Sequence, residues 1–360
     1  MAAVDLRNRL AAATGTALPS TVVLTRPTPA ALADHLLELL DSAPDSDGQE
    51  DTAPTDGVPD DLVTRLHRDA VRAGRLDEAG TLLRGLAALR PRSAEPVPPV
   101  VDRLTAGGTG TRLVCVAPVV PLTGPHTYFT LAGSLPDDWS ISCLTPPGFG
   151  PDEPLPATRE ALVAGLAGAV ASGADGAPGA PGAPGTDGTA DGAPVVLLGT
   201  SSGGILAHET ARYLAAHGTP VRAVVLLDTY GLDTPAAASL RPHLWHALYE
   251  RERQAGGYTA AHLSAYAWTV DLLHTWTPGP VPFPTLLLRA SDPLPAPPGA
   301  DPAPERWRTE LPCVTTTLTT PGDHFTLTNE HAAATAGLIR DWLAGTGIGP
   351  VMPGADGSGR

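Results

Sequence analysis

Short apolar runs alternate with helical segments from residue 110 onward, and this alternation most constrains the fold. Several runs, such as VVLLG at 195–199, are apolar at every position, as expected of strands covered on both faces. The alternation predicts an α/β fold, a mostly parallel sheet with helices on both faces. The predicted strands span 112–117, 140–145, 195–199, 222–228, 285–290 and 313–319. The predicted helices span 158–171, 202–217, 240–277 in pieces, and 328–344.

A glycine-rich turn, GTSSGG, joins the third of these strands to the next helix. Gly199, Ser201 and Gly203 fit the pattern G-x-S-x-G in the strand–turn–helix context that lifts a serine above a sheet. Such a turn is strained, and glycines two positions away relieve the crowding. Ser202 fails this test because Thr200 stands at its upstream glycine position. The spacing therefore predicts Ser201 as a nucleophile and the backbone N–H of Ser202 as an oxyanion donor.

Two other interpretations of the turn compete with the nucleophile. A phosphate-binding loop would carry a lysine after the glycines, and the chain contains no lysine. A plain structural turn between a strand and a helix is the second alternative. Partner residues for the serine therefore carry much of the weight of the prediction.

A serine hydroxyl needs a base to take its proton, and in this architecture the acid and then the histidine follow the serine in the chain. His324 follows the last predicted strand in a loop, which favours it as the general base. His331 falls within the last predicted helix, and His208 lies on the helix after the turn and points away. His126 is ambiguous.

Two aspartates compete to orient the histidine. Asp228 ends the strand RAVVLLD, and Asp292 follows the next strand, where general α/β hydrolases place their acid. Either loop is able to reach the imidazole, so spacing does not separate them. Asp323, beside the histidine, would have to fold back on itself.

Charge and composition exclude several classes of protein. The net charge of −15 leaves no electrostatic footprint for nucleic acid or an anionic membrane. Cys115, Cys143 and Cys313 share no metal-like spacing, and an odd number of buried thiols fits a reducing compartment. The sequence shows neither a signal peptide nor a long apolar run. We therefore expect a soluble, cytoplasmic protein without a metal.

Composition also divides the chain into segments. Residues 1–40 predict two short helices, and 59–91 predict a pair of helices whose apolar faces cover either the following domain or a second copy of the chain. The acidic stretch 41–58 predicts a disordered linker. The Gly/Ala/Pro run 173–194 predicts a flexible loop, and 346–360 a disordered tail.

From residue 59 to 345 the chain resembles the terminal thioesterase domain of modular type I polyketide synthases. The matching pieces occur in family order and include TGPHTYFTLAGSLP, PPGFGPDEPLP, LLGTSSGGILAHETARYLAAHG and PGDHFTLTNEH. The resemblance implies the α/β-hydrolase fold. Residues 1–40 resemble the end of an acyl carrier protein whose attachment serine is absent, so we expect no pantetheine arm on this chain.

The resemblance also implies roles for individual residues. It places the catalytic acid at Asp228, with Tyr230 and Thr200 beside a substrate chamber, and the second oxyanion donor at the N–H of Val119 or Val120. It further implies a lid over 231–280, whose aromatic and aliphatic side chains line the chamber or belong to the core. The helix pair at 59–91 corresponds to a homodimer contact.

The predicted function is release of a polyketide chain. An acyl group arrives on the phosphopantetheine of an acyl carrier protein, transfers to Ser201, and leaves by hydrolysis or macrolactonisation; no cofactor is bound. The alternatives are a stand-alone or proofreading acyl-thioesterase or esterase that uses Asp292, and a catalytically dead module that docks a carrier protein. Nothing in the sequence selects between hydrolysis and macrolactonisation.

Overall fold

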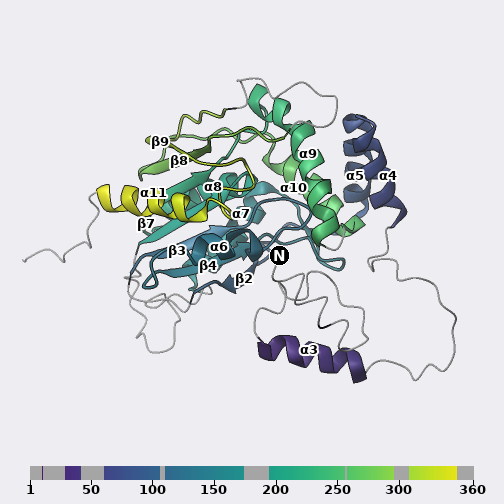
Figure 1. Ribbon diagram of the computed structural model, residues 1–360, viewed down its shortest axis with the longest axis horizontal. Helices are drawn as coiled ribbons and strands as arrows, with labels where there is room; N and C mark the ends of the chain where they lie inside the picture. Colours follow the sequence, from purple (N-terminus) through teal and green to yellow (C-terminus); the bar gives the residue numbers. More distant parts are fainter. Residues whose placement is uncertain are drawn as a thin grey trace, which may run out of the picture.

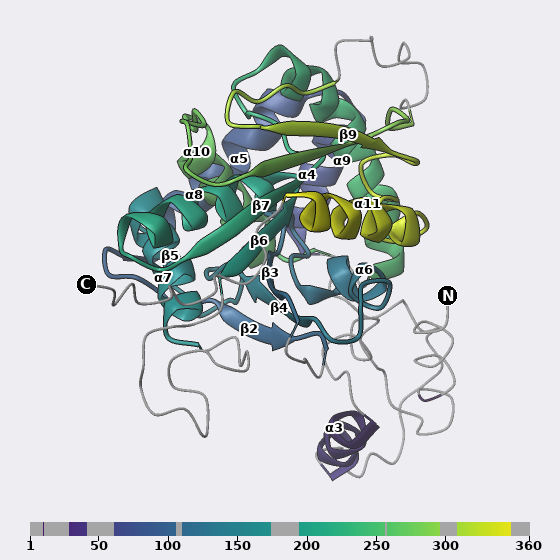
Figure 2. The ribbon, with the colours of Figure 1, turned by 90° about the vertical axis from the view of Figure 1, so that its left-hand side faces the viewer.

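The computed structural model describes residue 10 and residues 29–41, 61–105, 110–173, 194–255, 258–295 and 308–346. Its centre is a seven-stranded sheet with the strand order β2-β4-β3-β6-β7-β8-β9 (Figure 2). The strands are β2 Val100–Arg103, β3 Arg112–Val116, β4 Ser140–Thr145, β6 Val195–Thr200, β7 Val221–Leu227, β8 Thr285–Ala290 and β9 Thr316–Thr320. The six predicted strands are therefore all present.

All neighbouring strands of this sheet pair in parallel except β2, which runs antiparallel to β4 at the edge. The sequence analysis missed β2, because its four residues VVDR are partly exposed and too few to form an apolar run. It also missed a small parallel sheet of β1 (Arg92–Ser93) and β5 (Leu155–Pro156). The last strand begins at Thr316 rather than 313, after a turn.

Helices cover both faces of the sheet (Figures 1 and 2). The short 3₁₀ helix η1 (Pro125–Tyr128), α6 (Phe129–Ala132) and α11 (Ala332–Gly345) lie on one face, and α7 (Arg159–Ala171) and α8 (Ser202–Ala216) lie on the other. Side chains alternate along β3: Val114 and Val116 join the core under α7 and α8, whereas Leu113 and Cys115 join the core under α6 and α11. The predicted two-sided α/β architecture is confirmed.

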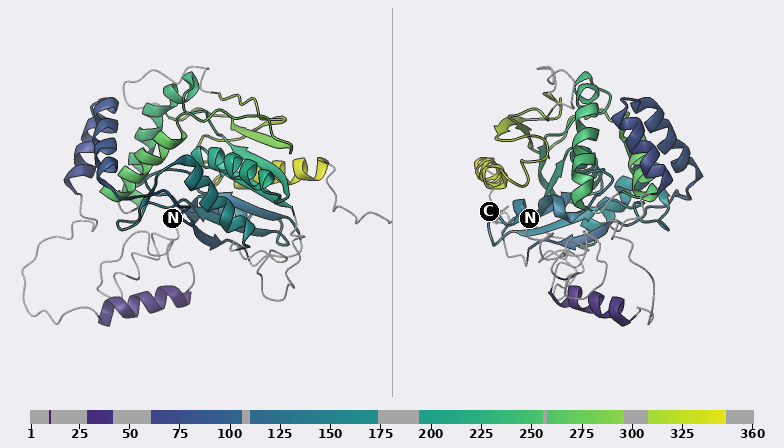
Figure 3. Two further views of the ribbon diagram at one scale, coloured as in Figure 1. Left: turned by 180° about the vertical axis from the view of Figure 1, so that it is seen from behind. Right: turned by 45° about the vertical axis from the view of Figure 1, so that its right-hand side comes forward.

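Four further helices stand above the carboxyl end of the sheet, and we call them the helical cover (Figures 1 and 3). They are α4 (Leu62–Arg72), α5 (Leu76–Leu89), α9 (Pro235–Ala255) and α10 (Ala260–Leu273). The last two occupy the segment predicted as a lid. The α5 helix packs on α10, and its buried residues are Ala79, Leu83 and Ala87.

Within this cover, the α4 helix is joined to α9 and to the segment before α10 through polar contacts. Thr64 Oγ1 donates to the Tyr258 carbonyl at 3.1 Å, and His67 Nδ1 is hydrogen-bonded to the Tyr249 hydroxyl. The helix pair predicted for 59–91 is thus attached to the rest of the chain, but mainly through residues other than its leucines. Three leucines stay exposed, at 59%, 49% and 84%: Leu62, Leu66 and Leu89.

The amino-terminal region contributes one helix with full bounds, α3 (Pro29–Asp41), which lies apart from the sheet in Figures 1 and 2. It coincides with the second helix predicted in 1–40. The first predicted helix, apart from Leu10, lies outside the described residues. So do nearly all of the predicted linker 41–58, loop 173–194 and tail 346–360.

Candidate active site

Ser201 occupies a turn that few residues adopt. It follows β6 and precedes α8 with φ 54° and ψ −130°, a region that strains any residue with a side chain. A Cβ on Gly199 would lie 2.1 Å from the Gly203 carbonyl oxygen, and one on Gly203 would lie 2.4 Å from the Val116 carbonyl oxygen. Both glycines of the motif are therefore required by close backbone approach.

Asp228 directly follows β7, which pairs with β6, so its side chain emerges at the same carboxyl edge of the sheet. It is fully buried, and its Oδ2 accepts a hydrogen bond from His324 Nδ1 at 2.8 Å. Its Oδ1 accepts from the Ala290 N–H at 3.1 Å. Ser201 and Asp228 are the two non-glycine residues with positive φ in the described part of the chain. Backbone strain therefore concentrates at this site.

Tyr230 lies against this pair. Its hydroxyl donates to Asp228 Oδ2 at 3.2 Å, and its ring centroid is 6.0 Å from that of His324. Burial, followed by the nearby Asp228 carboxylate, raises the pKa of Tyr230 well above its ordinary value. The phenol is therefore a neutral donor that holds the carboxylate in place.

The other candidate acids and histidines lie elsewhere. Asp292 is exposed, and its backbone N–H bonds the Gly322 carbonyl at 2.9 Å. Asp323 Oδ1 instead accepts from the N–H groups of Phe325 and Thr326, which shapes the loop that carries His324.

His331 precedes α11 instead of lying within it, which corrects the predicted start of that helix at 328. His208 is fully buried beside Trp276, with ring centroids 5.5 Å apart, so it belongs to the core.

The loop after β3 faces the start of α8. The Val119 N–H donates to Ser202 Oγ at 2.9 Å, and the Val120 N–H donates to the Pro118 carbonyl at 3.0 Å. Ser202 is the first residue of α8, so its own N–H points out of the helix end. The predicted oxyanion donors thus come from two elements that meet at Ser201.

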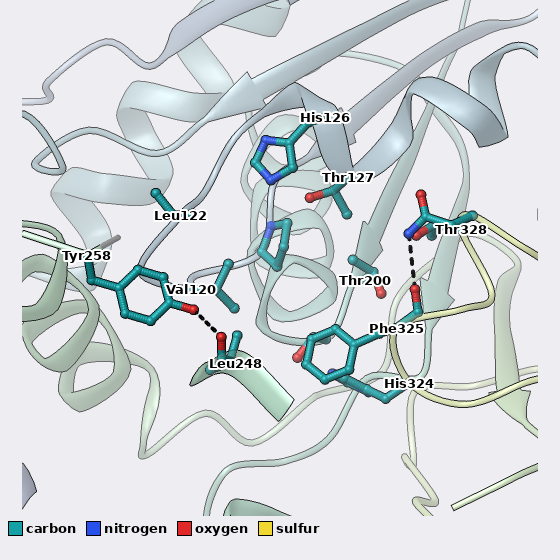
Figure 4. A pocket seen from close by; sticks show the side chains of 13 residues that line it. Val120, Leu122, His126, Thr127, Thr200, Leu248, Tyr258, His324, Phe325 and Thr328 are labelled. Carbon is teal, nitrogen blue, oxygen red and sulfur yellow. Dashed lines mark hydrogen bonds between the residues drawn. The ribbon is translucent and has the colours of Figure 1, made fainter. Parts of the chain in front are cut away.

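A pocket of about 300 Å³ opens beside Ser201 and His324 (Figure 4). Leu122, Val120 and Tyr258 lie on one side in this view, and His126, Thr127 and Thr328 lie on the other. Its remaining lining residues are Pro118, Thr200, Leu248, Phe325 and Asn329. One side is therefore mainly apolar and the other polar.

A second, smaller pocket of about 90 Å³ also reaches Ser201. It contains the predicted chamber residue Tyr230 together with residues of α9 and α10, namely Leu240, Arg241, Leu244, Tyr266 and Val270. Ser201 and Val120 line both pockets, so the serine lies where they meet.

Side chains of the segment 231–280 lie both at the two pockets and in apolar clusters. Leu244, Leu248, Tyr258 and Tyr266 line the two pockets, whereas Trp245, Tyr249, Leu263, Leu273 and Trp276 are buried in apolar clusters.

Sequence reasoning missed the contribution of other loops to the main pocket. His126 and Thr127 come from η1, and Thr328 and Asn329 follow His324. Burial lowers the pKa of His126, and a hydrogen bond to the backbone of Leu122 opposes that shift. The usable signal was position, because these residues follow β3 and β9 at the carboxyl edge of the sheet.

The Tyr128 hydroxyl was also missed. It donates to the Val116 carbonyl at 2.7 Å and accepts from the Thr200 N–H at 3.0 Å. The fully buried ring thereby joins the end of β3 to the nucleophile turn.

Among the residues that the structure describes, no group of three or more His, Cys, Asp or Glu side chains is placed to hold a metal ion. None of the helices described is both long and apolar enough to cross a bilayer. The three cysteines are buried and carry free thiols.

Comparison with known proteins gives a consistent family. Residues 186–343 match the family model of the thioesterase domain. The chain is 38% identical over 360 residues to the spectinabilin polyketide synthase system protein NorC of Streptomyces orinoci, covering 96% of this chain and 14% of that protein. It is 33% identical over 351 residues to erythronolide synthase EryA3 of Saccharopolyspora erythraea, covering 96% and 10%. The chain thus spans a small part of each synthase.

A solved structure, the NocB thioesterase domain from the nocardicin cluster, is 24% identical with a TM-score of 0.47, covering 68% of this chain and 98% of that one.

The parallel sheet, the serine at its strand–helix turn and the histidine–aspartate pair at the same edge define an α/β hydrolase fold. Residues 186–343 belong to the thioesterase domain family, and the chain as a whole is related to modular polyketide synthases. The predicted fold and the family resemblance are therefore confirmed.

Proposed function

We propose that this chain releases a polyketide acyl group from the phosphopantetheine of an acyl carrier protein. One observation carries the proposal: His324 Nδ1 is 2.8 Å from the buried Asp228 carboxylate, in a loop that shares a pocket with Ser201. A histidine bonded through Nδ1 keeps Nε2 free to accept a proton from a serine. The relationship to polyketide synthases supports the choice of acyl group and carrier.

In the first half-reaction, Ser201 Oγ attacks the thioester carbonyl while His324 Nε2 takes its proton. Asp228 orients the ring and stabilises the imidazolium that forms. The backbone N–H of Ser202 and one N–H of the loop after β3 stabilise the oxyanion. The carbon–sulfur bond breaks, the proton passes to the thiolate, and an acyl-serine remains.

Of the two valines proposed for the second donor, Val120 is favoured. The Val119 N–H is already bonded to Ser202 Oγ, whereas the Val120 N–H closes only a three-residue turn onto Pro118. Val120 also lines both pockets beside Ser201.

In the second half-reaction, His324 removes a proton from water or from a hydroxyl of the acyl chain itself. Attack by water gives an acid, and attack by the hydroxyl gives a macrolactone. In both cases the C–O bond to Ser201 breaks and His324 returns a proton to the serine. We propose that the two pockets that meet at Ser201 separate the acyl chain from the pantetheine arm.

The domain organisation follows from the same proposal. Residues 59–345 form the thioesterase, with 231–280 as the lid, and residues 1–40 are the end of a carrier protein. The exposed Leu62 and Leu66 on α4 support 59–91 as a homodimer contact.

The test uses the full chain in two steps. A fluorophosphonate is expected to modify Ser201, as located by peptide mass spectrometry, and Ser201→Ala is expected to prevent modification. Mass spectrometry of the products from a hydroxyacyl thioester then distinguishes an acid from a lactone, which is one water lighter. Absence of labelling in the folded protein would favour a catalytically dead carrier-docking module.

A further inference from the structure

The Ser202 side chain has no part in the mechanism above, yet it makes two contacts with the loop after β3. Its Oγ accepts from the Val119 N–H at 2.9 Å and donates to the Val119 carbonyl at 3.3 Å. Both residues are buried. A hydroxyl on the nucleophile helix therefore holds the backbone of a loop about eighty residues earlier in the chain.

The loop has little freedom apart from this contact. Its start is fixed by the sheet, because the Ala117 N–H donates to the Leu144 carbonyl at 2.9 Å. Pro118 fixes its own φ angle, and Pro121 restricts Val120 to extended conformations. The contact between Ser202 and Val119 then sets how far this stiff segment lies from α8.

Ser202 contributes to the oxyanion site in two ways under the proposed mechanism. Its backbone N–H is one donor. Its hydroxyl is hydrogen-bonded to Val119, and the neighbouring residue Val120 supplies the other donor. The same residue thus connects the two donors directly. An oxyanion site depends on donors placed before charge develops, because reorganisation during the reaction would cost free energy.

We propose that Ser202 is a positioning residue whose hydroxyl sets the separation of the two oxyanion donors. This inference rests on the proposed function of Ser201. It differs from a purely structural role, in which the hydroxyl only satisfies the buried Val119 N–H. The structural role predicts lost stability alone, whereas the positioning role also predicts a selective loss of transition-state binding.

The decisive variant is Ser202→Ala, which keeps the backbone N–H and removes the hydroxyl. We expect kcat/KM for an acyl thioester to fall about 10- to 100-fold. Affinity for a trifluoromethyl ketone analogue, which forms a tetrahedral adduct with Ser201, should fall by the same factor. Affinity for the matching non-cleavable thioether should change less than about twofold, because that ligand develops no oxyanion.

A matched control comes from the opposite edge of the sheet. The Thr105 hydroxyl likewise bonds one backbone carbonyl and one backbone N–H, donating to the Trp139 carbonyl at 2.8 Å and accepting from the Ile141 N–H at 3.0 Å. Thr105→Val should lower the melting temperature and leave both ligand affinities unchanged. Ser202→Thr, which keeps a hydroxyl, should retain most activity and keeps the test usable if the alanine variant fails to fold.

Two results would overturn the inference: equal changes in affinity for the ketone and the thioether, or higher activity in Ser202→Ala. Higher activity would mean that the hydroxyl withholds the Val119 N–H from the oxyanion. Fluorophosphonate labelling separates this failure from that of the proposed function. If the wild-type Ser201 is labelled and Ser202→Ala behaves like Thr105→Val, only the positioning role is wrong.

Discussion

The nucleophile turn and the helical cover above it are held by different kinds of contact. The turn is fixed by backbone atoms at close approach, as at Gly199 and Gly203, and by the pairing of β6 with its two neighbours. The cover is fixed by side chains, among them His67 against Tyr249 and Thr64 against the Tyr258 carbonyl. The nucleophile turn therefore tolerates almost no change in its backbone. In the helical cover, by contrast, single side-chain contacts are replaceable without moving the backbone.

The largest effect on the nucleophile turn and its partner residues is expected from the pair of variants Asp228→Asn and Asp292→Asn. The first should lower kcat by about 10³- to 10⁴-fold, because an amide does not stabilise the imidazolium and favours the wrong tautomer. The second should leave kcat within about twofold, since that side chain is exposed. Steady-state kinetics on one thioester measures both. Loss of turnover only in Asp292→Asn would assign the acid to the other loop.

Gly199→Ala tests the steric argument at the same turn. A methyl group 2.1 Å from the Gly203 carbonyl oxygen has to displace backbone, which should lower the free energy of unfolding by about 3 kcal/mol or more and remove activity. Gly168→Ala on α7 is the matched control, because its Cβ would meet no atom within 4 Å. Chemical denaturation of the two variants compares them directly. Equal stabilities would mean that the turn relaxes easily.

In the cover, acid should weaken the attachment of α4. Burial lowers the pKa of His67 from 6.5 to about 4, so the folded state holds this histidine neutral. The free energy of unfolding is unaffected by His67 above pH 6.5 and decreases as pH falls toward 4, because the unfolded chain binds the proton first. At pH 4 this loss of stability reaches about 3 kcal/mol.

Unfolding curves between pH 4 and 7 measure this effect. His67→Gln should be less sensitive to pH than the wild type, whereas Thr64→Val should lose similar stability at every pH. Parallel curves for His67→Gln and the wild type would contradict the prediction.

The smallest effect is expected at the pocket wall. Leu248→Trp fills part of the pocket of about 300 Å³ and should lower kcat/KM about 10-fold for a long acyl thioester, while an acetyl ester reacts normally. Leu89→Trp, at a residue 84% exposed, should affect neither substrate. An equal loss of kcat/KM on both substrates would show that the substitution disturbs the nucleophile turn.

The difference between the two regions also explains what the sequence predicted. The strands, the helices and the motif around Ser201 follow from local apolar patterns and from steric limits on a few residues. The pairing of Asp228 with His324 does not follow from such patterns, because Asp228 and Asp292 each follow a strand and either loop was able to reach the histidine. The contact of the Ser202 hydroxyl with Val119 was equally hidden, since it depends on the path of a loop between two prolines.

The Asp61 carboxylate limits where the chain is cut when it is fused to another protein. Asp61 Oδ1 accepts from the Thr64 N–H at 2.8 Å and caps α4, while Oδ2 accepts from the Ala260 N–H at 3.1 Å at the start of α10. A fusion boundary placed after this residue would therefore remove the cap of α4 and one hydrogen bond at the start of α10, almost 200 positions later in the chain. Truncated or fused versions of this chain should therefore keep the junction on the amino-terminal side of Asp61.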